Sequence, residues 1–263
     1  MKTDLGIFSH FGFNLPLEER LSLISESGFA HVFTYFDDAE TLTQDNNHIN
    51  AYLGRTFNLS LDSIHSSYDD ANFVWSNEEK DRQKILKYYK DCLDFCSKHG
   101  IPNLVIHPIK TDTPPPFSQV GLGLFLDVTS HAEARGVRVA LENTRTNEHV
   151  DTLLGKIDSK SLGLCYDTSH DNLYGDPPLS LLNKWLDRLL VLHLSDNLGE
   201  KDDHMLPGKG SFDWGAFTQV LRKVKNGGCP LMLEAFPERD YNDPRVFLQE
   251  AFDKLSELRK MVG

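Results

Sequence analysis

Residues 189–214 read LLVLHLSDNLGEKDDHMLPGKGSFDW and contain one complete example of the unit from which the chain is built. The apolar run from 189 to 194, interrupted only by His193, is typical of a buried strand. The polar loop that follows carries Asp202 and His204, and Asp213 is a suitable N-cap for a helix beginning there. The stretch therefore predicts a strand, a long loop rich in potential ligands, and a helix.

The same alternation of strand and helix recurs along the whole sequence. Short apolar strands are expected at residues 4–8, 31–36, 59–65, 103–107, 137–142, 162–167, 189–194 and 230–234. Helices are expected at residues 16–27, over most of 39–57, and at 78–98, 120–135, 147–156, 178–188, 213–224 and 244–261. Eight such units in 263 residues match the size of one closed barrel of parallel strands. We expect the α/β class, with a (β/α)8 TIM barrel forming a single domain over residues 1–263.

The composition limits the classes of function. The formal net charge of −12 argues against a nucleic-acid partner without excluding one, because phosphate binding needs a local excess of Lys and Arg. No apolar run approaches the roughly 20 residues of a membrane-spanning helix, and the first residues lead into a strand rather than a signal sequence. The four cysteines contain no CxxC pair and fit reduced core positions. We expect a cytoplasmic protein without a membrane partner, and a homodimer is compatible with the sequence.

Histidines and carboxylates stand where the predicted strands end. In barrels of this type, functional side chains lie at the C-terminal ends of the strands. A single histidine there is more often part of the hydrogen-bonded structure than a ligand, but six strand ends carry such residues here. Imidazole and carboxylate groups together suit zinc, manganese or cobalt. The sequence therefore predicts a divalent-metal site with one to three ions per chain, and its candidate ligands are His65, His107, Glu142, Asp167, His170, His193, Asp202, His204 and Glu234.

The motifs around these residues resemble the xylose-isomerase-like TIM-barrel superfamily. This superfamily joins sugar phosphate isomerase and epimerase proteins with endonuclease IV, the second family of AP endonucleases. The similar segments are LEN, DTSH, HLSD and LEAF, together with a Pro-Gly-x-Gly loop ending in Asp-Trp. The resemblance to the ketose epimerases implies one divalent ion held by four residues and a substrate contact from His170. The four implied ligands are Glu142, Asp167, His193 and Glu234.

The resemblance to endonuclease IV implies a different site. That enzyme holds three zinc ions with nine ligands, and all nine candidate positions of this chain match them. The departures lie elsewhere: the chain is shorter, and no basic or aromatic DNA-facing loop can be matched. The segment SYDDANFVWSNEEKD at residues 67–81 is acidic where a DNA groove would be repelled. The Gly-Lys-Gly turn before Asp213 and Trp214 is closer to the sugar branch.

Two reactions follow from these alternatives. In an isomerase or epimerase, Glu142 and Glu234 would transfer protons through a metal-stabilised enediolate, with His170 as a third catalytic group. In a zinc phosphodiesterase, Glu142 would instead bridge two ions. His65 and His107 would share one of these ions with it, and a third ion would be held by His170, Asp202 and His204. A third hypothesis is a barrel that binds metal but has no catalytic activity.

Our first expectation is a divalent-metal-dependent isomerase or epimerase of a sugar, keto-sugar or related polyol, with or without a phosphate group. The alternative is a trinuclear zinc phosphodiesterase similar to endonuclease IV. The expected partner is a small carbohydrate substrate. Residues that follow the later strands could contact it, namely Arg145, Lys209, Trp214 and Arg239.

Overall fold

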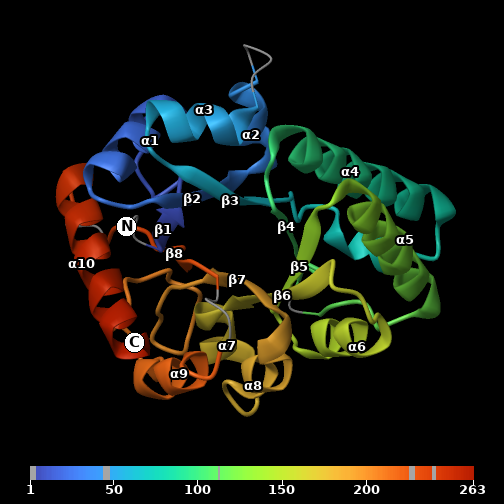
Figure 1. Ribbon diagram of the computed structural model, residues 1–263. Helices are drawn as coiled ribbons and strands as arrows, with labels where there is room; N and C mark the ends of the chain where they lie inside the picture. The colour runs from blue at the N-terminus through green and yellow to red at the C-terminus, as the bar shows by residue number, and fades with distance from the viewer. Residues whose placement is uncertain (1–3, 44–47, 112, 225–228, 239–240) are drawn as a thin grey trace.

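Eight parallel strands form the centre of the protein in a computed structural model, which describes residues 4–43, 48–111, 113–224, 229–238 and 241–263 (Figure 1). The strand order is β7-β6-β5-β4-β3-β2-β1-β8. Backbone hydrogen bonds from Leu194 N to Met232 O (2.8 Å) and from Glu234 N to Leu194 O (3.0 Å) join β7 to β8 and close the barrel. The predicted (β/α)8 barrel is confirmed. The strands are β1 Leu5–Phe8, β2 His31–Tyr35, β3 Ser60–His65, β4 Asn103–Ile106, β5 Arg138–Glu142, β6 Leu162–Asp167, β7 Leu189–His193 and β8 Leu231–Leu233.

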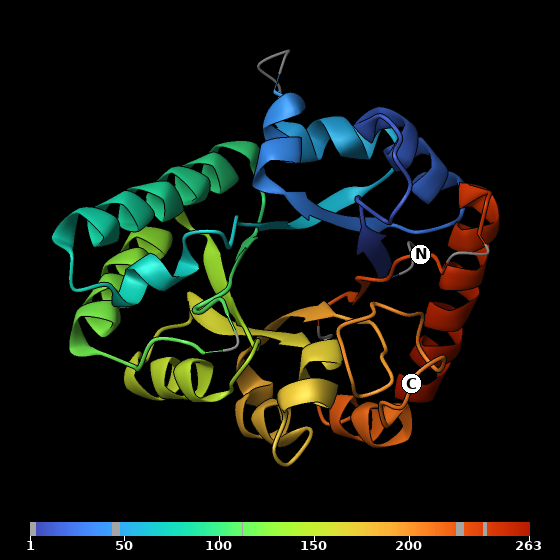
Figure 2. The same cartoon turned by 180° about the vertical axis from the view of Figure 1, so that it is seen from behind.

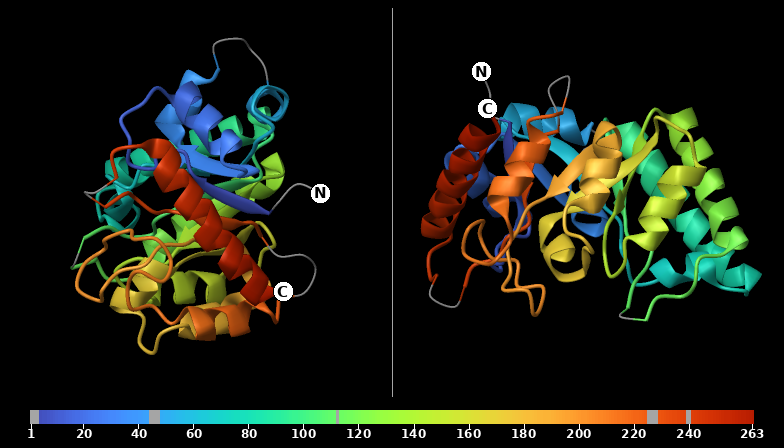
Figure 3. Two further views of the ribbon diagram at one scale, coloured as in Figure 1. Left: turned by 90° about the vertical axis from the view of Figure 1, so that its left-hand side faces the viewer. Right: turned by 90° about the horizontal axis from the view of Figure 1, so that it is seen from below.

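Helices surround the strands on the outside of the barrel, as Figures 1 and 2 show from opposite sides. The last of them, α10, packs along β1 and β8 on the outer surface (Figure 3). No helix in the described part of the chain is long and apolar enough to cross a membrane. The helices are α1 Leu17–Glu26, α2 Phe36–Thr41, α3 Ile49–Thr56, α4 Glu79–His99, α5 Gln119–Arg135, α6 Glu148–Lys156, α7 Thr168–Tyr174, α8 Ser180–Trp185, α9 Trp214–Leu221 and α10 Pro244–Val262, with short 3-10 turns at Ala71–Trp75 and Leu186–Arg188.

Local sequence signals account for the longest elements. In α4 the apolar residues Ile85, Tyr89 and Leu93 recur every four positions and are all buried against the barrel. Gly100 ends this helix with φ +70°, a left-handed conformation that glycine adopts without a steric penalty. Asp213 caps α9 as predicted, because its Oδ1 accepts a hydrogen bond from the backbone N–H of Ala216 at 2.8 Å.

Two helical segments differ from the prediction. The helix expected over most of residues 39–57 is divided into α2 and α3, and residues 44–47 lie outside the described part of the chain. The short helix α7 follows β6 directly and was not predicted. Its seven residues, TSHDNLY, lack an apolar stripe of helical period, so hydrophobic periodicity could not reveal it. This missed helix carries His170.

Candidate metal centre

The candidate ligands are continuations of the side-chain layer that fills the barrel. One interior cluster consists of Val105, Ala140, Cys165 and Val191, which are all fully buried. Successive side chains of a strand alternate between its two faces, so the residue two positions further along points to the same side. Two positions after these four residues stand His107, Glu142, Asp167 and His193. The pattern of the strands therefore aims these ligands into the same end of the barrel.

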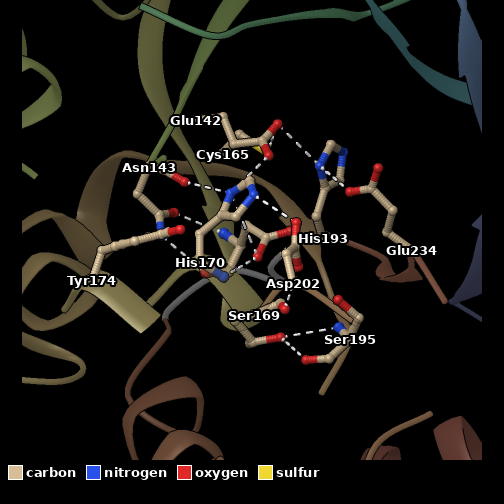
Figure 4. Close-up of polar contacts among 12 residues, drawn as sticks. Glu142, Asn143, Cys165, Ser169, His170, Tyr174, His193, Ser195, Asp202 and Glu234 are labelled. Carbon is tan, nitrogen blue, oxygen red and sulfur yellow. Dashed lines mark hydrogen bonds and ion pairs between the residues drawn. The ribbon is translucent and has the colours of Figure 1, made fainter. Parts of the chain in front are cut away.

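Four of these residues form a compact buried set, here called the quartet: Glu142, Asp167, His193 and Glu234. One donor atom from each lies within 4.8 Å of the donor atoms of the others. The Nδ1 atom of His193 lies 3.1 Å from Glu142 Oε2 and 3.0 Å from Glu234 Oε2 (Figure 4). None of the four residues is more than 7 % exposed. Four strands, β5 to β8, thus contribute one donor each.

The quartet fits a metal ion better than it fits a hydrogen-bonded cluster. His193 Nε2 and Asp167 Oδ2 have no hydrogen-bond partner among the described residues, although both atoms are buried. His193 Nδ1 lies close to two carboxylate oxygens, but neither contact has hydrogen-bond geometry. Such atoms are costly to bury unpaired. Two donors bound to one ion at about 2.0–2.2 Å lie roughly 3.0–3.5 Å apart, and the 3.0 and 3.1 Å separations around His193 have this size. The donor set suits zinc, manganese or cobalt.

A second group of ligands shares Glu142 with the quartet. His65 Nε2 lies 3.2 Å from Glu142 Oε2, and His107 Nε2 lies 3.3 Å from Glu142 Oε1. The two Nε2 atoms are 3.2 Å apart. Nδ1 of His65 is 2.7 Å from the backbone oxygen of Ser66, a contact that fixes the ring with Nε2 toward the cavity. Glu142 therefore stands between two groups of donors that could each hold a cation.

A third group is formed by His170, Asp202 and His204. The Oδ2 atom of Asp202 lies 3.2 Å from His170 Nε2 and 3.1 Å from His204 Nε2. Each ring is anchored through its other nitrogen, since His170 Nδ1 lies 2.8 Å from Asn143 O and His204 Nδ1 lies 2.9 Å from Glu234 O. All nine predicted ligands therefore face one end of the barrel.

The helix α7 explains the position of His170. Asp167 is its N-cap, and the Oδ1 atom of Asp167 accepts a hydrogen bond from the backbone N–H of His170 at 2.7 Å. The other oxygen of Asp167, Oδ2, has no hydrogen-bond partner among the described residues and is available to the metal site. One carboxylate thus serves the helix and the candidate metal site with different oxygens, and it fixes the first turn of α7, from which His170 reaches the inner end of the barrel.

Protons balance the charge of the buried carboxylates when no cation is bound. Burial opposes the ionisation of Glu142, but the imidazoles of His107 and His193 lower its pKa well below the usual range. Burial raises the pKa of Asp167 to about 7, against the attraction of His170. Burial also opposes the protonation of His170 and His193, yet the acidic groups around them hold both pKa values well above the usual range. A divalent cation would take over the charge that these protons supply.

Seven of the nine ligands border a cavity of about 260 Å³, here called the inner cavity, and Asp167 and His193 lie outside its lining. Arg145 lines it, as predicted for a substrate contact, and its guanidinium donates a hydrogen bond to Tyr174 Oη. Sequence reasoning missed Lys110 and left Tyr68 undecided, because neither stands at a strand end in a recognisable motif. The residues of the lining other than Arg145 and the ligands are Tyr35, Tyr68, Ile109, Lys110, Thr111, Thr144 and Phe236.

The other predicted substrate contacts, Lys209, Trp214 and Arg239, are not among the residues that line the inner cavity in the described part of the chain. Lys209 does not line the inner cavity, because Tyr241 and two glutamates hold its ammonium group near α10; the hydrogen bond to Tyr241 Oη is 2.8 Å. Trp214 is also outside the lining. Its indole N–H donates to Asp196 Oδ2 at 2.8 Å, and its ring packs against two phenylalanines of the core. Arg239 lies outside the described residues.

Comparison with known families agrees with this geometry. The family described as xylose isomerase-like TIM barrel matches residues 21–257. The chain belongs to this family. The resemblance inferred from the LEN, DTSH, HLSD and LEAF segments is thereby confirmed. The proteins similar in sequence to this chain include one named inosose isomerase and one named probable endonuclease 4.

Two relatives show how much of the chain the sequence similarity covers. An uncharacterised protein of Sinorhizobium fredii is 31 % identical over 206 residues, which cover 73 % of this chain and 65 % of that protein. A probable endonuclease 4 of Geotalea daltonii is 27 % identical over 190 residues, covering 62 % of this chain and 66 % of its own. The chain therefore matches just under two thirds of the length of each relative.

Solved structures show the same fold. The 3-keto-D-glucoside 4-epimerase of E. coli superposes with a TM-score of 0.76 at 20 % identity and covers 98 % of this chain and 100 % of its own. The IOLI protein, determined with a bound zinc atom, has a TM-score of 0.73 at 18 % identity and covers 98 % of both chains. A protein of the same fold thus holds a zinc atom, and the quartet of this chain is a donor set that could hold a metal ion.

Proposed function

We propose that this protein is a divalent-metal-dependent isomerase or epimerase of a sugar, keto-sugar or related polyol, with or without a phosphate group. The observation that carries the proposal is the quartet of buried donors at the ends of β5 to β8, all within 4.8 Å of one another. The likeness of the fold to a 3-keto-D-glucoside 4-epimerase supports the choice of substrate class. The cavity of about 260 Å³ beside the quartet has room for one sugar unit.

The quartet would hold one divalent ion, for which zinc, manganese or cobalt are the candidates. A bound ion of this kind acts as a Lewis acid on adjacent substrate oxygens and stabilises the negative charge that develops when a neighbouring C–H bond loses its proton. Asp167 and His193 are fully buried and serve as ligands only. Glu142 and Glu234 also border the inner cavity, where a substrate would lie.

The two glutamates are the proposed proton-transfer groups. Oε2 of Glu234 contacts His193, and Figure 4 shows its other oxygen turned away from that ring. Glu142 enters from β5 and Glu234 follows β8, so they reach the substrate from different sides of the cavity. One carboxylate removes a proton from carbon and the other returns one on the opposite face, which inverts that carbon. His170 is placed to donate a hydrogen bond to a substrate oxygen.

Proton exchange with solvent tests this assignment. The metal-loaded protein is incubated in deuterium oxide with a panel of ketoses, keto-glycosides and inososes, and deuterium at carbon next to the carbonyl is measured by mass spectrometry. Glu234→Gln should abolish the exchange that the wild-type protein shows, while Glu200→Gln, on the exposed part of the same rim, should retain it. Metal content is measured in both variants. Full exchange in a metal-loaded Glu234→Gln protein would refute the role of Glu234.

One observation favours a second candidate, a zinc phosphodiesterase. His65 and His107 add a second donor group to Glu142, and a carboxylate between two such groups is suited to bridge two ions. In that case Glu142 would be a ligand only, and clustered zinc ions would serve phosphodiester hydrolysis. The relative named as a probable endonuclease 4 points to the same chemistry.

Metal stoichiometry separates the two candidates. The isomerase or epimerase predicts one tightly held ion per chain, whereas the phosphodiesterase predicts about three. Elemental analysis of the gel-filtered protein after zinc loading gives this number directly. Hydrolysis of bis(4-nitrophenyl) phosphate and of a duplex with an abasic site is assayed on the same sample. One ion with no hydrolysis would remove the phosphodiesterase, and three ions with hydrolysis would replace the first proposal.

A further inference from the structure

We propose that a second cavity beside the metal centre binds an uncharged, hydroxyl-bearing second unit of the substrate. The protein would then act on a glycoside or another two-unit carbohydrate and discriminate against phosphorylated sugars. This inference rests on the proposed isomerase or epimerase function and narrows its substrate class. The second cavity, here called the outer cavity, has a volume of about 380 Å³ and is lined by His10, Tyr35, Phe36, Asp37, Asp38, Ser67, Tyr68 and Asp69.

The outer cavity adjoins the inner one at two tyrosines. Tyr35 and Tyr68 line both cavities. The ring of Tyr35 stands edge-on to His65, with ring centres 5.7 Å apart, and the ring of Tyr68 stacks on His107 at 5.0 Å. A molecule whose reacting part lies beside the candidate ligands can therefore extend across these rings into the outer cavity.

The two volumes favour a substrate larger than one sugar. The inner cavity of about 260 Å³ is below the range of roughly 300–1,000 Å³ that is usual for small-molecule sites. The outer cavity, at about 380 Å³, is larger than the inner cavity. A single hexose seated beside the quartet would fill the inner space and leave the outer space to solvent. A second sugar ring is the kind of group that would occupy both.

The lining of the outer cavity suits a sugar ring. Tyr35, Phe36 and Tyr68 supply aromatic surface, which packs against the apolar C–H face of a pyranose. The Ser67 hydroxyl and three carboxylates supply hydrogen-bonding groups around this surface. Sites of this composition, aromatic walls with a few polar groups, hold and orient small polar ligands.

The charge of the outer cavity excludes a phosphate. Arg20 pairs with Asp38 at 3.1 Å, and Lys110 pairs with Asp69 at 2.6 Å. Asp37 is exposed to the cavity and has no cationic partner among the described residues. Three carboxylates against two engaged cations leave a negative surface, which repels an anionic group and accepts hydrogen bonds from sugar hydroxyls.

A binding experiment on the zinc-loaded full chain tests the proposal. The probes are a panel of neutral disaccharides with α and β linkages, their component monosaccharides, and the corresponding monosaccharide phosphates, each titrated by calorimetry. At least one disaccharide should bind tenfold or more tightly than its component sugars, and the phosphates should bind more weakly than the unmodified sugars. Equal affinity for all three classes, or no binding by any disaccharide, would overturn the proposal.

Two variants of Asp37 localise the effect. Asp37→Asn should weaken disaccharide binding by about 3- to 10-fold, because a neutral amide oxygen accepts a weaker hydrogen bond than a carboxylate does, and leave monosaccharide binding unchanged. Asp37→Lys should raise the affinity for monosaccharide phosphates. The matched control is Glu40→Gln, which removes an exposed charge from the same helix α2 outside the cavity lining. Loss of affinity in the control but not in Asp37→Asn would contradict the assignment.

The outcomes also separate this inference from the proposed function. Disaccharides that bind with the expected preference but never exchange a carbon-bound proton with solvent would support the outer cavity and refute the isomerase or epimerase. Solvent exchange with monosaccharides, without any gain in affinity from a second unit, would support the reaction and refute the role of the outer cavity.

Discussion

Asp196 holds the loop that carries two of the candidate ligands, and its replacement should release that loop. Its carboxylate is fully buried and accepts four hydrogen bonds. Oδ1 accepts from the backbone N–H of Asn197 at 2.9 Å and of Phe212 at 3.1 Å. Oδ2 accepts from the backbone N–H of Gly208 at 2.9 Å and from the indole N–H of Trp214 at 2.8 Å. One side chain thus ties together both ends of the loop at residues 197–213.

The ligands of this loop depend on the same anchor. The backbone of Met205 pairs with that of Asp196 through two hydrogen bonds of 2.8 Å. His204, immediately before it, has φ +49°, a left-handed conformation that costs a histidine energy and persists only when its surroundings impose it. Release of the loop would let His204 relax and would withdraw Asp202 from His170.

The size of the effect follows from the hydrogen bonds. Asp196→Asn keeps one acceptor oxygen but turns an amide N–H₂ toward two of the four donors. Each buried donor left without a partner costs about 1–3 kcal/mol, so we expect a loss of roughly 2–6 kcal/mol for the loop. A loss of about 3 kcal/mol raises the open population of the loop by roughly 100-fold. The barrel itself should remain folded, since domains have about 5–15 kcal/mol in total.

Limited proteolysis measures this population. The side chain of Lys201 lies within the loop and is 79 % exposed, so trypsin cleaves there when the loop opens. Asp196→Asn should be cleaved at Lys201 many times faster than the wild-type protein, with far-UV circular dichroism unchanged. The matched control is Asp203→Asn, in the same loop, whose carboxylate pairs with Lys201 at 2.9 Å and with no other cation in the described part of the chain. Equal cleavage of both variants, at the wild-type rate, would refute the anchoring role of Asp196.

Three further predictions concern the stability of the barrel. Burial raises the pKa of Asp62 to about 6, so the folded state binds this proton more tightly than the unfolded state does, and the free energy of unfolding falls as pH rises from about 4 to about 6. Asp62→Asn should remove up to about 3 kcal/mol of that fall, measured by urea titration at each pH. An identical pH profile for the variant and the wild-type protein would contradict this prediction. Zinc at about 100 times its Kd should raise the free energy of unfolding by about 2.7 kcal/mol over the chelated protein, and Asp167→Asn should abolish most of this gain at the same zinc concentration, which thermal melts would show. A Cβ atom at Gly6 would lie 2.3 Å from Met232 Sδ, whereas a Cβ atom at Gly123 would meet nothing within 4 Å. Gly6→Ala should therefore destabilise the protein by about 1–3 kcal/mol, and Gly123→Ala, in a helix, should stabilise it. Equal urea midpoints for the two variants would contradict this packing.

The elements with strong local signals were predicted well. The strand β6 begins and ends at the predicted residues, Leu162 and Asp167, because an uncharged run from Leu162 to Tyr166 between polar segments marks its position. The helix α4 agrees within one residue at each end, since its apolar spacing is regular and Gly100 stops it. The helix α7 was missed because it is short and its cap, Asp167, lies at the end of a strand.

The side-chain contacts around the site were predicted less completely. Lys209 and Trp214 follow β7 in the sequence and were expected at the substrate, but their partners come from distant segments. Lys209 pairs with Glu250 at 3.1 Å, and Trp214 donates to Asp196 at 2.8 Å. Side-chain direction in a long loop depends on such partners, which no local pattern specifies.

The sequence by itself determined that eight strand–helix units build the chain and which strand ends carry imidazoles and carboxylates. Both features are local, because alternation along a strand and apolar spacing along a helix are set by backbone geometry. Only the tertiary structure decided which donors share a site. The register of the strands and the closure of β7 onto β8 place Glu142 against His65, His107 and His193 at 3.1–3.3 Å, although up to 128 residues separate these four positions in the chain.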